Sequence, residues 1–168
     1  MYHIPDDKRA KESAHKIYKS VRKILKRKSL MDVTVMDIKN DCGISRSTFY
    51  RLFDNVPDVL EYQLGIFFDR YLKQSLEHED RILFFYQFFY LHTDLIYIIS
   101  TQSEYILKKV MKEKSKEKDE YLLAFKVGIM TSLLIKWSER RKKETPEEMA
   151  DITKKLLSLN MTDLLTEI

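Results

Sequence analysis

Residues 34–53, TVMDIKNDCGISRSTFYRLF, predict two short helices joined by a tight turn. Thr34 can cap the first helix, and Asp37 three residues later completes a capping-box pattern. Gly43 follows where a left-handed residue is needed to end a helix and turn the chain. Ser45 can cap the second helix, because its hydroxyl can accept a hydrogen bond from a free backbone N–H.

The second helix of this pair should have one apolar and one polar side. Phe49, Leu52 and Phe53 stand at helical spacing and should face the core. Two short helices around a turn, with polar groups on the outer side of the second, are typical of a helix-turn-helix, which places a helix in the DNA major groove. The predicted DNA contacts from this region are Thr34, Ser45, Arg46, Ser47, Thr48, Tyr50 and Arg51.

The same region resembles the DNA-binding signature of the TetR family of transcriptional regulators. The resemblance spans residues 34–60 and is carried by Thr34, Val35, Asp37, Ile38, Gly43, Ile44, Ser45, Thr48, Phe49, Tyr50, Phe53, Asp58, Val59 and Leu60. A second segment, in which Trp137 precedes a basic run and TPEEMA at residues 145–150, is similar to the connection between the last two helices of many members. The resemblance implies a homodimer on a pseudo-palindromic operator, with DNA affinity that changes when an effector alters the spacing of the two heads.

Two positions depart from the family pattern. The family often has His or Tyr at the position of Leu52 and Lys at the position of Val56, where they commonly touch DNA phosphates; here both residues are apolar. We therefore expect phosphate contacts from elsewhere, and we expect Val56→Lys to strengthen DNA binding. The alternative function is that of a helical dimer with the same fold that serves as a protein-binding coactivator or adaptor, with weak or no DNA binding.

The composition favours an all-α fold. Gly and Pro number only 3 each among 168 residues, so the chain has few places to turn sharply. Apolar spacing and capping patterns predict further helices over residues 6–28, 55–76, 81–100, 102–118, 120–142 and from 145 onward. We expect a three-helix DNA-binding head over residues 1–54 and a helical regulatory and dimerisation domain over residues 55–168.

Positive charge is concentrated in the predicted head. Residues 1–60 hold 13 Lys and Arg against 8 Asp and Glu, a net charge of +5, whereas residues 61–168 carry a net charge of −1. Lys and Arg on phosphates release condensed counterions, so the head suits a polyanion, with Lys8 and Arg9 as further contacts. The charged N-terminal stretch lacks an apolar signal core, and no long uninterrupted apolar stretch occurs, which predicts a cytoplasmic protein without a membrane partner.

An aromatic stretch within residues 81–100 is the candidate effector site. A helix that is apolar on all sides should be buried on all sides. Large rings with few small residues between them favour gaps, so we expect a cavity for a small apolar or aromatic effector of little charge. Its predicted lining is Phe84, Phe85, Phe88, Phe89, His92 and Tyr97. A solid core without a cavity is the alternative.

The last two helices carry more apolar surface than one small subunit readily covers, which supports the homodimer that the resemblance implies. The predicted interface residues are Leu133, Leu134, Trp137, Ile152 and Leu156.

Catalytic and metal-binding patterns do not emerge from the sequence. There is no Gly-rich phosphate loop, nucleophile elbow or Cys–His metal spacing. The four His residues are scattered, and the single Cys42 can form no intrachain disulfide. We therefore expect neither an enzyme nor a bound metal or cofactor.

Overall fold

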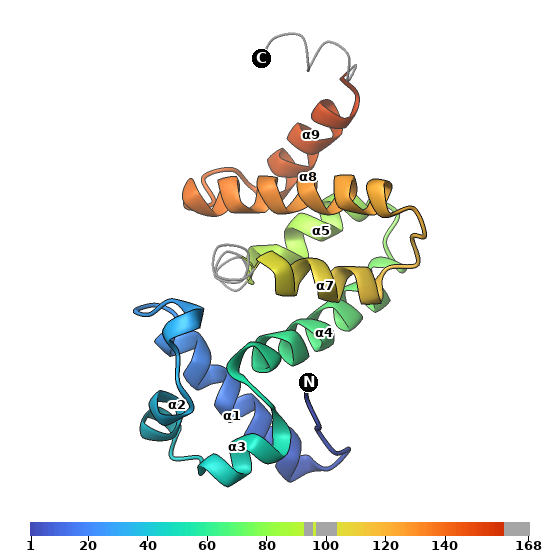
Figure 1. The fold of residues 1–168 in the computed structure, drawn as a ribbon. Coiled ribbons are helices and arrows are strands. Elements are labelled where there is room, and N and C mark those ends of the chain that lie inside the picture. Colours follow the sequence, from blue (N-terminus) through green and yellow to red (C-terminus); the bar gives the residue numbers. More distant parts are fainter. Residues whose placement is uncertain (93–95, 97–103, 160–168) are drawn as a thin grey trace.

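The computed structural model describes residues 1–92, 96 and 104–159, and its regular structure over these residues is helical. The α-helices are α1 Lys8–Ile24, α2 Val35–Cys42, α3 Arg46–Leu52, α4 Val56–Ser75, α5 Arg81–Tyr90, α7 Glu104–Lys114, α8 Glu120–Glu139 and α9 Pro146–Leu157. A short 3-10 helix, Leu30–Asp32, joins α1 to α2. Helices α1 to α3 form one end of the molecule and α8 and α9 the other (Figure 1). The predicted all-α fold is confirmed.

The helix-turn-helix has the local structure that its sequence predicts. The Thr34 hydroxyl accepts a hydrogen bond from the Asp37 N–H at 3.1 Å, and the Asp37 carboxylate accepts one from the Thr34 N–H at 2.9 Å. Gly43 follows α2 with a φ of 71°, in the left-handed region that Gly adopts without steric cost. The Ser45 hydroxyl caps α3 by accepting from the Thr48 N–H at 3.1 Å. The turn therefore follows from groups a few residues apart in the chain.

α1 carries the apolar stripe that forms the core of the head. It is capped by Asp7 and ends at Ile24, before the predicted end at residue 28. One side of α1 packs on α2, α3 and α4. The most completely buried side chains of this core, each at most 1% exposed, include Ile17, Val21, Ile38, Phe49, Leu52 and Phe53. Each such burial stabilises the fold by roughly 1.5–3 kcal/mol relative to an exposed side chain.

α4 connects the head to the other helices. It begins with the predicted capping box, in which Asn55 and Asp58 exchange side-chain and backbone hydrogen bonds, and Pro57 lies in its first turn. α4 packs on α1 of the head and also on α5 and α7. A movement of α7 relative to α4 can therefore reach the head through a single continuous helix.

α5 is shorter than the sequence predicts. It begins at Arg81, as expected, but ends at Tyr90 rather than at residue 100. The N–H groups of Leu91 and His92 both turn back to the Phe89 carbonyl, which closes the helix with a tight turn. Apolar composition predicts burial but supplies no stop signal, so helix length is left to tertiary packing. Beyond residue 92, the rest of the predicted helix lies outside the described residues, apart from residue 96.

The connection from α8 to α9 folds back sharply. Arg141 and Lys142 have φ values of 57° and 55°, in the left-handed region. The Trp137 indole N–H donates to the Glu144 carbonyl at 2.9 Å, which fixes the loop against the end of α8. The predicted capping box at Thr145 then starts α9, which packs on α5.

Candidate functional site

α3 lies at the end of the molecule farthest from α9 (Figure 1). Arg46, Ser47, Tyr50 and Arg51 are exposed. The Tyr50 ring is 55% exposed and rests edge-on against the buried Phe49 ring, with centroids 5.5 Å apart. The apolar side of α3 thus anchors the helix, while two guanidinium groups and a phenol project outward. These are the groups that can read base edges and hold phosphates.

Several predicted contact residues use their hydroxyls inside the motif. The Thr34 hydroxyl donates to the Asp37 carboxylate at 2.8 Å. The Ser45 hydroxyl lies 2.9 Å from the hydroxyls of both Ser47 and Thr48. These groups start and hold the helices, so the charged groups that α3 projects outward are its two arginines.

Leu52 and Val56 lie in the core and do not face the surface of the head. Leu52 is fully buried, and Val56 is 6% exposed. This burial argues against the expectation that Val56→Lys strengthens DNA binding, because a buried ammonium group without a partner is costly.

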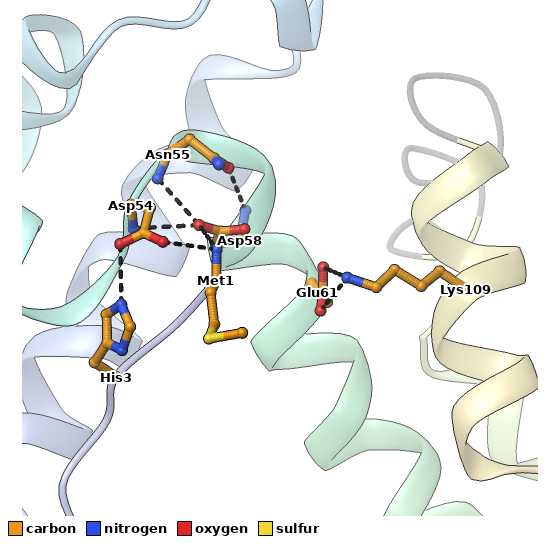
Figure 2. Close-up of polar contacts among 7 residues, drawn as sticks. All are labelled: Met1, His3, Asp54, Asn55, Asp58, Glu61 and Lys109. Atoms are coloured by element: carbon orange, nitrogen blue, oxygen red, sulfur yellow. Dashed lines mark hydrogen bonds and ion pairs between the residues drawn. The ribbon is translucent and has the colours of Figure 1, made fainter.

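The first residues of the chain brace the segment that follows α3 (Figure 2). The His3 N–H donates to the Leu52 carbonyl at 2.8 Å, and the Asp54 N–H donates to the Met1 carbonyl at 3.1 Å. The Met1 amino group lies 2.7 Å from the buried Asp58 carboxylate and 3.0 Å from that of Asp54. The amino group, and then His3, hold the pKa of Asp54 below its ordinary value. The end of α3 is therefore fixed to the start of α4.

Two ion pairs hold α2 to α1 and to the segment that follows α1. Lys28 lies 2.8 Å from Asp37, and Lys23 lies 2.5 Å from Asp41. Lys28, together with hydrogen bonds from Thr34, lowers the pKa of Asp37 to about 2. The acidic side chains of α2 are thus neutralised locally. Sequence reasoning missed both pairs, because their members are far apart in the chain.

Lys8 and Arg9 lie in the first turn of α1 and are exposed. α1 also contacts α3. The predicted phosphate contacts from this turn therefore remain available to a polyanion at the surface of the head.

The aromatic side chains of α5 mostly fill the core. Phe84, Phe88 and Phe89 pack on Tyr71 of α4 with ring centroids 5.8, 5.3 and 5.5 Å apart. Among the described residues, these three are absent from the lining of the cavities described below, whereas Phe85, which also packs on Tyr71, lines one of them. The effector site on these three therefore stays a prediction. Successive rings on α5 pack closely on a ring from α4.

The other members of the predicted effector site are separated from one another. His92 packs on Phe67, with ring centroids 5.1 Å apart, and borders a hollow that also involves α1 and α4. Tyr97 lies outside the described residues. Phe85 lines a different cavity.

That cavity lies among α4, α5, α7 and α8 and has a volume of about 290 Å³. Its lining comprises Phe68, Tyr71, Leu72, Arg81, Ile82, Phe85, Met111, Lys114, Ser115, Leu123, Lys126, Val127 and Met130. No sequence pattern marks this set, because its members come from four helices and a connection that only the tertiary structure brings together.

Within the part of the chain that the structure describes, no segment covers a broad apolar face of α8 and α9. A groove of about 590 Å³ between them is lined by Phe125, Gly128, Ile129, Ser132, Leu133, Leu156 and Leu157. Among the described helices, α8 alone is long and apolar enough to cross a membrane, by length and composition only. Only 17% of its most apolar stretch is buried. An exposed apolar surface of this extent indicates a binding face.

The predicted interface set divides between this face and the core. Leu133 and Leu156 line the groove. The side chains of Ile152 and Leu156 are each about 40% exposed. Leu134 and Trp137 are 3% and 1% exposed and belong to the core of their own chain. Their assignment to the interface is therefore wrong, because a buried side chain has no surface to offer a partner.

Comparisons with known proteins agree with this architecture. The family model described as a transcriptional regulator C-terminal region matches residues 67–159. The crystal structure of Lin0861 from Listeria innocua has a similar fold, with a TM-score of 0.78, 16% sequence identity, and coverage of 92% of this chain and 94% of that one. No curated protein matches the chain.

Proposed function

Since the chain belongs to the TetR family of transcriptional regulators, we propose that it binds a pseudo-palindromic DNA operator as a homodimer, with α3 of each subunit in a major groove. The observation that carries this proposal is the division of α3 into two sides. Phe49 and Leu52 are buried, whereas Arg46, Tyr50 and Arg51 are exposed. Such a helix is anchored by one side and free to contact bases with the other.

The apolar face of α8 and α9 supports the homodimer. Two heads are needed to bind the two halves of a pseudo-palindromic site, and a twofold dimer supplies them from one kind of subunit. Leu133, Ile152 and Leu156 remain the proposed interface residues, and Phe125 joins them because it lines the same groove and is 43% exposed. Dimerisation is also typical of the family.

α4 supports control of DNA binding from the C-terminal helices. At its first turn, Asp58 holds the segment that follows α3. One turn further on, both Glu61 carboxylate oxygens lie within 2.9 Å of Lys109 on α7 (Figure 2). An effector that binds the two arrangements of α4 and α7 unequally shifts the equilibrium between head spacings, and one that binds them equally does not. We expect this regulation to take place in the cytoplasm.

Fluorescence anisotropy with labelled genomic fragments tests the proposal. The dimer should bind a subset of fragments, and Arg46→Ala should weaken binding to a selected fragment by about 1–3 kcal/mol if the guanidinium reads a guanine. Lys118→Ala removes one positive charge from an exposed position in the connection between α7 and α8 and should leave the affinity unchanged.

The buried Leu52 and Val56 give the alternative function a specific basis, because they remove two positions from which the family commonly holds phosphates. A folded dimer that bound no genomic fragment would contradict the operator function and favour this alternative, a protein-binding coactivator or adaptor. Equal loss of affinity in Arg46→Ala and Lys118→Ala would contradict the placement of α3 in the groove.

A further inference from the structure

The cavity among α4, α5, α7 and α8 combines apolar walls with a positively charged rim. Its walls include three aromatic rings, from Phe68, Tyr71 and Phe85, and flexible side chains from Met111 and Met130. Every charged residue in its described lining is a cation: Arg81, Lys114 and Lys126. This arrangement differs from the uncharged aromatic cavity that the sequence predicts.

We propose that this cavity binds an amphipathic organic anion, in which an apolar chain or ring system carries one carboxylate group. The apolar part would lie against the rings and methionines, and the carboxylate would lie at the rim. That the bound anion is the effector of DNA binding rests on the regulator function proposed above; the binding itself does not.

The rim cations are arranged to accept a carboxylate. Lys114 lies 2.7 Å from Asp69 of α4. Asp69 is 61% exposed, so its carboxylate can return to water when another replaces it. Arg81 has no carboxylate within ion-pairing distance among the residues that the structure describes. A ligand can therefore exchange one partner of Lys114 for another and add a partner for Arg81, with little net burial of unpaired charge.

Tyr71, one of the residues that line this cavity, carries a hydroxyl group. The Tyr71 hydroxyl is protonated at neutral pH, and burial, which raises its pKa to about 12, disfavours the phenolate further. A protonated phenol donates to a carboxylate, whereas a phenolate would repel it.

Binding at Lys114 would act on the joint between α4 and α7. The Lys114–Asp69 ion pair joins these two helices, as does the Lys109–Glu61 pair. A ligand that takes Lys114 from Asp69 removes one of these links and inserts its apolar part between the same helices. Because α4 continues to the segment that follows α3, this exchange gives the ligand unequal affinity for different positions of the head.

Isothermal titration calorimetry of the DNA-free dimer tests the binding. Decanoate and 1-decanol serve as matched probes, because they share an apolar chain and differ in the charge of the head group, and 2-naphthoate distinguishes a ring from a chain. We expect at least one carboxylate to bind about tenfold more tightly than 1-decanol. Equal affinities for decanoate and 1-decanol, with no binding of 2-naphthoate, would overturn the proposal.

Two substitutions on the rim should act in opposite directions. Arg81→Met should weaken carboxylate binding about fivefold or more and leave 1-decanol binding unchanged. Asp69→Asn should tighten carboxylate binding several-fold, because Lys114 loses its competing partner; a merely structural loss cannot produce this gain. Lys73→Met, at an exposed position of α4 outside the cavity lining, is the control and should have no effect. Loss of affinity in Asp69→Asn would contradict the exchange at Lys114.

Anisotropy on a bound genomic fragment, with and without the carboxylate, separates this proposal from the regulator function. A dimer that binds the carboxylate but no DNA would support the cavity proposal and contradict the regulator function. A dimer that binds DNA but no carboxylate would support the regulator function and contradict the cavity proposal. A carboxylate that binds the dimer and leaves DNA affinity unchanged would overturn its role as effector.

Discussion

α1 and α8 are both long helices, but they cover their apolar residues in different ways. α1 buries its stripe of Ala14, Ile17 and Val21 against α2, α3 and α4. α8 buries only a few of its apolar residues, and Tyr121 and Phe125 are 90% and 43% exposed. The head thus completes its core within one chain, whereas the C-terminal helices present a face that a further surface must cover.

The sharpest test of this contrast is at Trp137, which the structure places in the core of its own chain. Trp137→Ala should lower the free energy of unfolding by about 3–5 kcal/mol, because it removes a fully buried ring and the hydrogen bond to Glu144. Urea unfolding followed by circular dichroism measures the change. If Trp137→Ala kept its free energy of unfolding and only failed to dimerise, Trp137 would belong to the dimer interface.

On the uncovered face of α8 and α9, a new charge should weaken the dimer and leave the fold of each subunit intact. Phe125→Asp should raise the dissociation constant of the dimer at least a hundredfold, about 2.7 kcal/mol, because a carboxylate would be buried without a partner. Analytical ultracentrifugation measures the dissociation constant, and Lys118→Asp, at an exposed position outside the groove lining, is the control. Subunits that dissociate should keep a folded head, since the core of the head lies within one chain. Unfolding of the head together with the loss of the dimer would contradict this independence.

Capping should matter locally in both regions. Thr34→Ala removes the cap of α2 and Thr145→Ala that of α9, and each should lower the free energy of unfolding by about 1 kcal/mol. Since the Thr34 hydroxyl is already bonded to Asp37, a folded Thr34→Ala variant should lose less DNA affinity than Arg46→Ala. Thermal melts and anisotropy measure the two effects. A larger loss of affinity in Thr34→Ala would mean that its hydroxyl contacts DNA directly.

The smallest expected effect concerns the pH dependence of the head. The pKa of Asp37 falls from an ordinary 3.8 to about 2, first through Lys28 and then through Thr34. The stability from this carboxylate is therefore present above about pH 4 and is lost as the pH falls toward about 2. The difference in melting temperature between the protein and Asp37→Asn should shrink over this range. The exposed Asp32→Asn is the matched control, and a constant difference in the Asp37 variant would show that the ion pair contributes nothing to this loss.

Features set by neighbours in the chain were predictable from the sequence. The caps at Thr34, Ser45 and Thr145 and the left-handed Gly43 each involve groups within a few residues of one another, so the residue types determine the hydrogen bonds and the backbone angle. The buried and exposed sides of α3 also follow from helical spacing, because the apolar and polar residues concerned all lie on this one helix.

Features that depend on several elements were decided only by the tertiary structure. Leu133 and Leu134 are adjacent and chemically the same, yet one lines the groove and the other is buried. The direction in which α8 is rotated against its neighbours makes that difference, and composition does not encode it. The same holds for the cavity, whose charged rim combines Arg81 of α5 with Lys114 of α7 and Lys126 of α8. The sequence determined which segments become helices and where most of them begin; the packing of those helices determined which apolar residues face inward and which cations meet around a cavity, because such contacts join atoms that are distant along the chain.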